Sequence, residues 1–474
     1  MNDAKLADMV WAARQFGHVE LGDVRRNRRL MRMAACACGR PSGKVAAVFT
    51  EKDEQQAAYD FLESDHVEVE AVVGGIAATT AESCRGKPYV YVAVDGTSVT
   101  VVDRKGEHDF GRIGSDDNGA RGLKVIDALA VDSGGVPVGL LGLTWWARSE
   151  ETSPRDTHAR QARPVEEKET RFWMHTIQGA SAALYEREVR GWFQLDREAD
   201  GADVLLTLAK TGHWWTVRSN ADRSIELEGG DRNRLRAELS RQPIAGTYDL
   251  DVVARPSKRK EVKARTARRA RMLVRTAQVV LRLRDKRTSA ITQLSVTAVW
   301  ALEQGTTPAG EDPLDWLLFT NYPVTTFEDA RKVVLGYAMR WRVEEFHKTW
   351  KSGETDVEST QLRSASAVKV WATILATVAV RLERLKRLAR EHGQLPASVD
   401  LSIHEIKALK MLKFGNNPPK KQPTIAQAVA WIAELGGFAS NSRKLPGATV
   451  LGRGLRYLKP AARLLEIQGD GAGE

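Results

Sequence analysis

The spacing of apolar residues divides the chain into a helical start, a β-rich middle and a helical end. Mixed 3.6-residue periodicity predicts short helices over about the first 70 residues. The pattern of apolar residues changes at Tyr89, where the first of three β-rich runs begins. The runs are Tyr89–Asp95, Leu123–Val131 and Val138–Leu143. A turn at Gly134–Pro137 separates the last two runs, so the three runs predict adjacent strands of one sheet.

The pattern then alternates before it becomes mostly strand-like. We expect a helix within Glu166–Arg190, a strand over Trp192–Asp196 and a helix over Ala202–Lys210. Strand-like sequence dominates from Trp214 to about Val324, in four main runs: Trp214–Arg218, Tyr248–Ala254, Arg271–Leu283 and Gln293–Trp300. Helical patterning returns at Phe327 and continues to the end, with a loop at Asn416–Lys421. The chain is therefore predicted to be an α/β protein.

The composition gives the chain a net positive charge. The 474 residues suit two to four domains, and 71 Lys and Arg against 61 Asp and Glu leave a net charge of +10. Such a charge favours a polyanionic partner, because binding phosphates releases counterions. Acidic substrates and simple solubility remain alternatives at this stage.

Cysteine usage and hydropathy indicate a reduced, soluble, cytoplasmic protein. Cys36, Cys38 and Cys84 do not have the spacing of a zinc site or a disulfide framework, so we expect small core residues. The N-terminus has no pattern of a signal peptide. The most apolar run, Val370–Val380, is shorter than the ~20 residues that cross a bilayer, so no membrane partner is expected.

One predicted helix gathers polar groups on a narrow stripe. At about 100° per residue, a single helix would place Tyr337, Arg340, Glu344, Lys348 and Lys351 within about 80° of one another. Four apolar residues would then face the core: Leu335, Met339, Phe346 and Trp350. The simpler interpretation is an amphipathic surface helix with a Glu344–Lys348 ion pair.

Two aspartates elsewhere in the sequence favour a functional role for this helix. Asp95 ends one β-rich run and precedes Gly96, and Asp196 ends another. Chemistry in open α/β sheets gathers beyond the carboxyl ends of strands. Three carboxylates suit a pair of Mg²⁺ ions, which prefer oxygen ligands and can catalyse phosphoryl transfer. Each aspartate alone could equally be a turn or cap residue.

Other catalytic and nucleotide-binding patterns do not fit. The segment Gly39–Val45 is one residue too short between its glycines for a phosphate-binding loop and lacks the Ser or Thr after Lys44. The sequence has no GxSxG nucleophile elbow and no HExxH zinc helix. We therefore expect no nucleotide cofactor.

The residues Tyr337, Arg340, Glu344 and Lys351 resemble the Y-(2)-R-(3)-E-(6)-K signature of bacterial insertion-sequence DDE transposases. The segment is particularly similar to that of the hairpin-forming cut-and-paste members of the kind used for tagmentation. Val94–Ser98 looks like the family's first-aspartate motif and Asp196–Asp200 like its second. Gly96 departs from the Thr or Ser of close relatives, which we expect to loosen a turn without removing the ligand. The resemblance extends over nearly the whole chain.

The resemblance implies an RNase H-like core, a mixed sheet flanked by helices, with a large β-strand insertion and helical terminal domains. Asp95, Asp196 and Glu344 would hold two Mg²⁺ ions per site, for which Mn²⁺ could substitute. Tyr337, Arg340, Lys348 and Lys351 would contact phosphates near the scissile end. Trp316 would stack a flipped base, although packing in a strand is the simpler role for it.

The resemblance also assigns the ends of the chain. Residues 1–70 would bind transposon ends through Arg25, Arg26 and Arg29, although a solvated basic helix is the alternative. Residues 71–391 would be the catalytic domain, with the β insertion at about 214–324 and an active-site arginine at Arg218. The basic stretch Lys258–Arg271 would follow the DNA backbone, although exposed strand edges also carry such charges for solubility. Residues 392–474 would form a dimerisation domain, matched mainly at Ala430–Phe438 and Arg443–Arg456. A homodimer would pair two transposon ends on double-stranded DNA and join them to target DNA.

Three functions remain open on the sequence. The first is an active cut-and-paste transposase that cleaves transposon ends through a hairpin and joins the 3′ ends to target DNA. The second is a catalytically inactive, transposase-derived DNA-binding regulator. The third is a nuclease that cuts without joining. The intact acidic residues and Tyr-Arg-Glu-Lys stripe favour the first.

Overall fold

The computed structural model describes residues 8–103, 106–114, 119–149, 163–227, 231–254, 264–439 and 445–470. The chain forms two compact units. The first unit comprises Met1–Thr152, Gly179–Val189 and Trp341–Glu474, and the second comprises Ser153–Gln178 and Arg190–Arg340. Helix α7 (Thr170–Tyr185) is divided between them, after a short 3₁₀ turn at Val165–Glu167.

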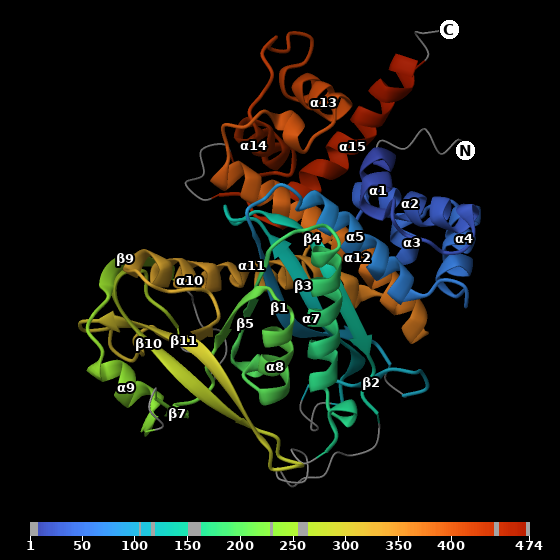
Figure 1. Ribbon diagram of the computed structural model, residues 1–474. Helices are drawn as coiled ribbons and strands as arrows, with labels where there is room; N and C mark the ends of the chain where they lie inside the picture. The colour runs from blue at the N-terminus through green and yellow to red at the C-terminus, as the bar shows by residue number, and fades with distance from the viewer. Residues whose placement is uncertain are drawn as a thin grey trace. The chain divides into compact units, whose positions relative to one another are not determined.

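Helices open the first unit, as the periodicity predicts (blue in Figure 1). They are α1 (Met9–Phe16), α2 (Val24–Gly39), α3 (Val45–Val48), α4 (Lys52–Leu62) and α5 (Val69–Ser83). Asp23 caps α2, because its carboxylate accepts a hydrogen bond from the backbone N–H of Arg25 at 2.8 Å. Leu30, Met33 and Ala34 bury one face of α2 and leave its arginine-rich face outside.

The sheet of the first unit is antiparallel in all its described strand pairs. It contains β1 (Val90–Val101), β2 (Gly111–Arg112), β3 (Arg121–Val131) and β4 (Pro137–Trp146). Strand β3 lies beside β1 and also pairs with β2 and β4. Helices α5 and α12 pack on β4, and helix α11 packs on β1. The three predicted β-rich runs are confirmed, and each strand is longer than its run.

Asp95 does not end its strand, so that prediction is wrong. It lies in the middle of β1, directly opposite Asp127 of β3, and Gly96 continues the ladder opposite Ile126 without a turn. Val99, Thr100 and Val101 extend the strand because β-branched residues fit a pleated surface. Val99 and Val101 are also buried, which fixes the register of this extension.

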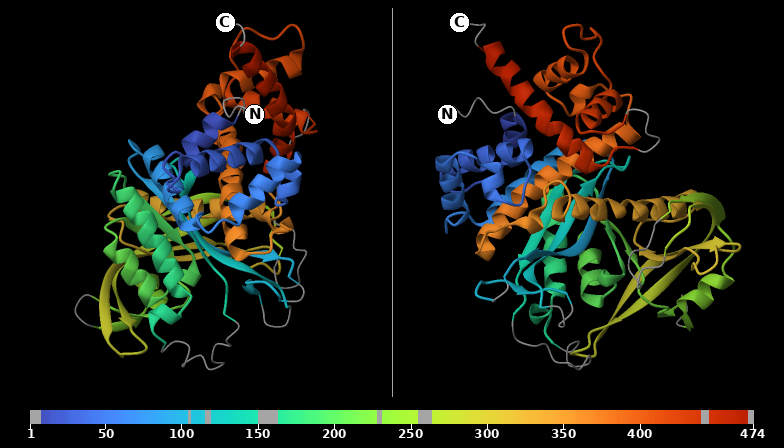
Figure 2. Two further views of the ribbon diagram at one scale, coloured as in Figure 1. Left: turned by 90° about the vertical axis from the view of Figure 1, so that its right-hand side faces the viewer. Right: turned by 180° about the vertical axis from the view of Figure 1, so that it is seen from behind.

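The C-terminal part of the first unit is helical (orange to red in Figure 2). Its helices are α11 (Trp341–Lys351), α12 (Ala365–Glu391), α13 (Ile403–Phe414), α14 (Ile425–Leu435) and α15 (Ala448–Asp470), with 3₁₀ turns at Val357–Ser359 and Ala397–Val399. Helices α13 and α14 pack against α15. Helix α12 is long and apolar enough to cross a membrane, but 89% of its apolar window is buried, as in a core helix.

The second unit consists mainly of strands. They are β5 (Gly191–Leu195), β6 (Trp214–Arg218), β7 (Ser224–Glu226), β8 (Arg232–Arg234), β9 (Gly246–Val252), β10 (Arg268–Arg284), β11 (Ile291–Gln304) and β12 (Asp315–Thr320). Strands β5 and β6 are parallel, whereas the other described pairs of this unit are antiparallel. The first part of α7 accompanies them, together with α8 (Ala202–Lys210), α9 (Leu235–Arg241) and α10 (Phe327–Met339). Strands β10 and β11 form a long hairpin, yellow in Figure 1.

The predicted single helix through Tyr337 and Lys351 is wrong. Helix α10 ends at Met339 and α11 begins at Trp341, so the element is divided at Arg340, whose backbone stays in the right-handed helical region. The inward face of α10 also differs, because Tyr337 is 6% exposed and Leu335 is 37% exposed. In α11, Phe346 and Trp350 are buried as expected. The predicted core-facing side is therefore wrong within α10 and right within α11.

The predicted fold class is confirmed. Strands and flanking helices alternate, the sheet strands are of mixed direction, and helices form both ends of the described chain, as expected of an RNase H-like core with helical additions. Two predicted features fall partly outside the described residues: the part of Lys258–Arg271 before residue 264, and the start of Arg443–Arg456 before residue 445.

Candidate active site

Two of the predicted metal ligands meet in the first unit. Asp95 comes from β1 and Glu344 from α11, and ligand atoms of Asp95, Glu344 and His347 all lie within 4.8 Å of one another. Asp95 is 7% exposed, and its Oδ1 accepts a hydrogen bond from the backbone N–H of Gly96 at 2.9 Å. We call Asp95, Asp127, Glu344 and His347 the acidic cluster.

Strand register and helix periodicity explain why these residues converge. Asp95 and Asp127 are direct partners across the β1–β3 pair, so their side chains project from the same face of the sheet. Glu344 and His347 are three residues apart on α11 and therefore share one face of that helix. Helix α11 packs on β1 and β3, which brings the two faces together.

Asp127 and His347 form the most buried contact of the acidic cluster. The carboxylate Oδ2 of Asp127 lies 2.6 Å from Nε2 of His347, and Asp127 has no exposed surface. Burial raises the pKa of Asp127, although the imidazole of His347 opposes this shift. Burial acts to lower the pKa of His347, but Asp127, with Asp95 and Glu344, outweighs it and raises that pKa. The ionised forms of both residues therefore support each other.

Sequence reasoning missed both residues of this contact. Asp127 lies within the β-rich run Leu123–Val131, and an acid in the middle of an apolar strand is an unusual position for a charge. His347 follows Glu344 by one helical turn, which is the spacing of side chains that act together on a helix. Those two signals were available in the sequence, but only the fold shows that they belong together.

The far side of α11 is held firmly against α12. Thr349 donates a hydrogen bond to Glu383 Oε1 at 2.6 Å, and the indole N–H of Trp350 donates to the carbonyl of Ala372 at 2.9 Å. The rings of Phe346 and Trp350 stack with their centroids 5.3 Å apart. These contacts fix the rotation of α11 and so the direction in which Glu344 points.

Two lysines of α11 provide positive charge near the acids. Lys351 donates a hydrogen bond to the hydroxyl of Thr97 at 3.3 Å and pairs with Glu358 at 3.5 Å. Thr97 is two residues from Asp95 and so on the same face of β1. Lys348 is exposed. Lys351 therefore contacts the face of β1 that carries Asp95, and its contact with a phosphate stays a prediction.

Asp196 lies in the second unit and follows the buried strand β5, as predicted. Its carboxylate accepts a hydrogen bond from the backbone N–H of Glu198 at 2.8 Å and caps a 3₁₀ turn, Arg197–Ala199. The cap role that the sequence left open is therefore present. Asp200 is nearly fully buried and pairs with Arg223 at 2.6 Å, which stabilises the turn after Asp196.

Three predicted DNA contacts lie in the second unit around the start of β12. Trp316 is half-buried and meets the ring of Tyr337 edge-on, with centroids 5.7 Å apart. Arg218 donates a hydrogen bond to the backbone carbonyl of Asp315 at 3.0 Å. The carboxylate of Asp315 accepts the indole N–H of Trp300 at 2.9 Å and holds the start of the strand in place. Arg340, which ends this unit, is 8% exposed.

The three predicted arginines of α2 have different surroundings. Arg25 has a side chain that is 85% exposed, although it pairs with Asp23 at 3.0 Å. Arg26 donates to the backbone carbonyl of Leu21 at 2.9 Å, and Arg29 pairs with Glu54 at 3.1 Å. Arg25 is thus the most accessible of the three, whereas Arg26 and Arg29 also stabilise the local fold.

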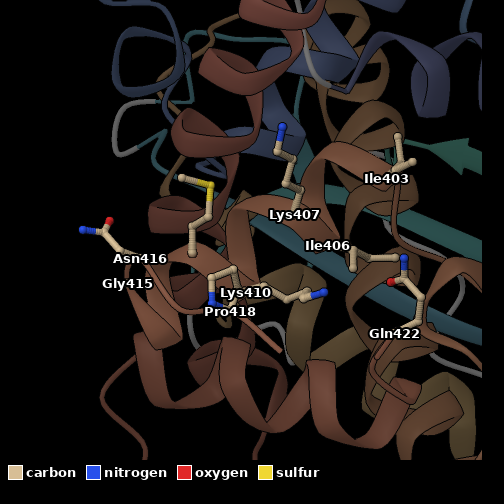
Figure 3. A pocket seen from close by; sticks show the side chains of 9 residues that line it. Ile403, Ile406, Lys407, Lys410, Gly415, Asn416, Pro418 and Gln422 are labelled. Atoms are coloured by element: carbon tan, nitrogen blue, oxygen red, sulfur yellow. The ribbon is translucent and has the colours of Figure 1, made fainter. Parts of the chain in front are cut away.

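A separate cavity lies at α13 and the loop that follows it (Figure 3). Its volume is about 440 Å³, and its lining combines apolar residues with Lys407 and Lys410. The lining contains no Asp or Glu, and none of the predicted site residues belongs to it. The cavity is therefore separate from the chemistry of the acidic cluster.

The donor set of the acidic cluster fits a hard divalent cation. Carboxylate oxygens that lie within 4.8 Å of each other repel when ionised, and a cation between them removes that repulsion. Mg²⁺ and Mn²⁺ both accept such oxygen ligands. Asp95 and Glu344 are the residues of this unit that would hold the ion.

Two family matches agree with this chemistry. Residues 8–67 match the Transposase DNA-binding family, and residues 241–381 match the Transposase DDE domain family. The second match includes Glu344 and His347 but neither Asp95 nor Asp196. With a DNA-binding domain at its start and a DDE domain that contributes Glu344 to the acidic cluster, the chain is a DDE-type transposase.

Proposed function

We propose that the protein is a cut-and-paste DNA transposase. It would bind the terminal repeats of its element, cleave them through a DNA hairpin and join the 3′ ends to target DNA. The observation that carries this proposal is the convergence of Asp95 and Glu344 in a chain with transposase DNA-binding and DDE domains. The similarity to hairpin-forming transposases of the Tyr-Arg-Glu-Lys type supports the finer steps.

In this proposal Asp95, Glu344 and Asp196 hold two Mg²⁺ ions, for which Mn²⁺ can substitute. The ions would supply charge stabilisation at the scissile phosphate and a more acidic water or 3′-hydroxyl. Asp196 would join the other two ligands from the end of β5. The protein's own part is to fix these carboxylates on a rigid strand, a rigid helix and a capped turn.

DNA contacts would come from both units. Lys348 and Lys351 on α11 would bind phosphates as point charges, and Arg340 would do so in a bidentate manner. Trp316, half-buried against Tyr337, has an aromatic surface on which a flipped base could stack, and stacking contributes about 1–3 kcal/mol per base. Arg218 lies beside the same strand. Tyr337 is buried, so its role would be mainly to position Trp316.

The ends of the chain would supply recognition and assembly. Residues 1–70 would bind the transposon end, with Arg25 as the most exposed of its three candidate arginines, Arg25, Arg26 and Arg29. Residues 71–391 would form the catalytic domain and residues 392–474 the dimerisation domain. A homodimer would then hold two ends in one synaptic complex. We place this activity in the cytoplasm, with the protein at the nucleoid when it is bound to DNA.

The test is Mg²⁺-dependent cleavage of linear DNA that carries the terminal repeats flanking the protein's own gene. Wild type should release the flanking DNA with a hairpin product and then join 3′ ends to a target plasmid. Glu344→Ala should bind the same ends without cleaving them. Specific binding with no cleavage by wild type in Mg²⁺ or Mn²⁺ would instead identify the DNA-binding regulator, and cleavage without joining would identify a nuclease.

A further inference from the structure

The contact between Asp127 and His347 connects the two elements that carry Asp95 and Glu344. Asp127 belongs to β3 and pairs directly with Asp95 across the sheet. His347 lies one helical turn after Glu344 on α11. The 2.6 Å contact between Asp127 Oδ2 and His347 Nε2 therefore joins strand to helix next to the two carboxylates.

Burial of the contact between Asp127 and His347 costs free energy, so a functional role would explain why the contact is kept. Asp127 is fully buried, and in the part of the chain that the structure describes its Oδ1 has no hydrogen-bond partner. A buried carboxylate normally needs several hydrogen bonds to offset its desolvation. Here the main compensation is one imidazole, which in turn has a ring nitrogen within 4.8 Å of oxygens from Asp95 and Glu344. An apolar pair would fill the same space with less loss of stability.

We propose that Asp127 and His347 are a positioning pair that sets the spacing of Asp95 and Glu344 for a divalent cation. The proposal rests on the proposed function, in which those two carboxylates are metal ligands. Asp127 orients the imidazole, and the imidazole holds α11 at a fixed distance from β1. Neighbours that orient metal ligands typically account for about 10–100-fold in metal affinity.

A general effect on helix packing is the competing explanation, and Thr349 offers a matched control. Thr349 lies on the same helix, is buried, and makes an equally short hydrogen bond of 2.6 Å to Glu383, on the side that faces α12. Thr349→Val removes one buried side-chain hydrogen bond from α11 without touching the acidic cluster. If α11 needed only tight packing, this change would disturb the carboxylates as much as Asp127→Asn.

The experiment measures Mn²⁺ binding to the full-length protein by electron paramagnetic resonance, without DNA. Wild type is compared with Asp127→Asn, His347→Gln, Thr349→Val and Glu344→Gln, and circular dichroism confirms that each variant is folded. We expect the Kd for Mn²⁺ to rise about 10–100-fold in Asp127→Asn and His347→Gln and by less than about twofold in Thr349→Val. His347→Gln keeps the test decisive if Asp127→Asn does not fold.

Three outcomes would overturn the positioning role. They are wild-type Mn²⁺ affinity in folded Asp127→Asn or His347→Gln, an equal loss of affinity in Thr349→Val, and a directly coordinated nitrogen in the electron spin echo spectrum of wild type, which would make His347 a ligand. Failure of the proposed function looks different: wild type would bind no Mn²⁺ saturably, or Glu344→Gln would bind it as well as wild type does.

Discussion

Two ionic clusters of the first unit differ in their balance of charge. The balanced cluster consists of two acids and two bases, Asp8, Glu405, Arg381 and Lys459, each less than a tenth exposed. Arg381 binds Asp8 at 2.8 Å and Glu405 at 3.4 Å, and Lys459 binds both carboxylates. The acidic cluster instead contains three carboxylates and one imidazole.

The difference separates a structural role from a functional one. In the balanced cluster each charge has an opposite charge within contact distance, so the four residues mainly hold α1, α12, α13 and α15 together. In the acidic cluster, Asp95 and Glu344 bring like charges close together, which costs free energy that a divalent cation would recover. An excess of acids over bases in a cluster is therefore a better sign of a metal site here than burial alone.

The largest expected effect comes from Glu344→Gln, which should separate activity from stability. With Glu344 as a metal ligand of the proposed transposase, cleavage of transposon ends should fall on the order of 1,000-fold, because such a ligand supports several kcal/mol of charge stabilisation. Stability without metal should stay the same or rise, since one of two neighbouring like charges is removed. End cleavage and thermal unfolding of the same preparation measure both. A melting temperature several degrees below wild type would assign Glu344 a structural role.

The comparison of the two clusters also shows which residues of the candidate site could be predicted from the sequence. Asp95, Asp196 and Glu344 were predicted from short local motifs. Strands lie where the β-rich runs before the two aspartates predicted them, whereas the single helix predicted around Glu344 is divided in two. Asp127 and His347 lie 220 positions apart, and Asp8 and Lys459 lie 451 positions apart, so no local pattern could pair them. Such partners are defined by strand register and helix packing, which depend on the whole core.

Two further errors had local physical causes. Gly96 suggested a turn after Asp95, but the following β-branched residues and their buried positions continued the strand. Arg340 fits a helix by propensity, yet it lies between two helices, which the sequence did not reveal. Propensity predicted the elements well and their boundaries poorly, because tertiary packing decides where each element stops.

Lys459→Met should produce the largest loss of stability. It leaves Asp8 and Glu405 buried with Arg381 as their remaining partner in the cluster, and breaking a buried ionic network costs about 3–5 kcal/mol. Urea unfolding monitored by tryptophan fluorescence gives the change in free energy. Mn²⁺ affinity of the folded fraction should match that of wild type. A loss below about 1 kcal/mol would show that the balanced cluster contributes little to stability.

Divalent cations should stabilise the folded protein only by binding at the acidic cluster. At a Mn²⁺ concentration about 100 times the Kd, binding to the native state adds about 2.7 kcal/mol to the free energy of unfolding. Wild type and Lys459→Met should gain equally, whereas Glu344→Gln should gain far less. Thermal melts across a Mn²⁺ titration test this. An equal gain in Glu344→Gln would mean that the stabilising ion binds elsewhere.

The smallest expected effect is the loss of stability at low pH that the balanced cluster causes. Burial acts to raise the pKa values of Asp8 and Glu405, but Lys459 and Arg381 outweigh it and hold both pKa values below their ordinary range. The unfolded chain therefore takes up protons at these carboxyls first, as the pH falls through about 4. The stability that these two carboxylates contribute is fully present above that pH and is lost as the pH falls toward their folded pKa values. Glu405→Gln should lower stability at pH 7 and also flatten its decline between about pH 5 and pH 3. Urea midpoints measured at several pH values give this slope, and a slope equal to that of wild type would show that Glu405 does not carry the acid dependence.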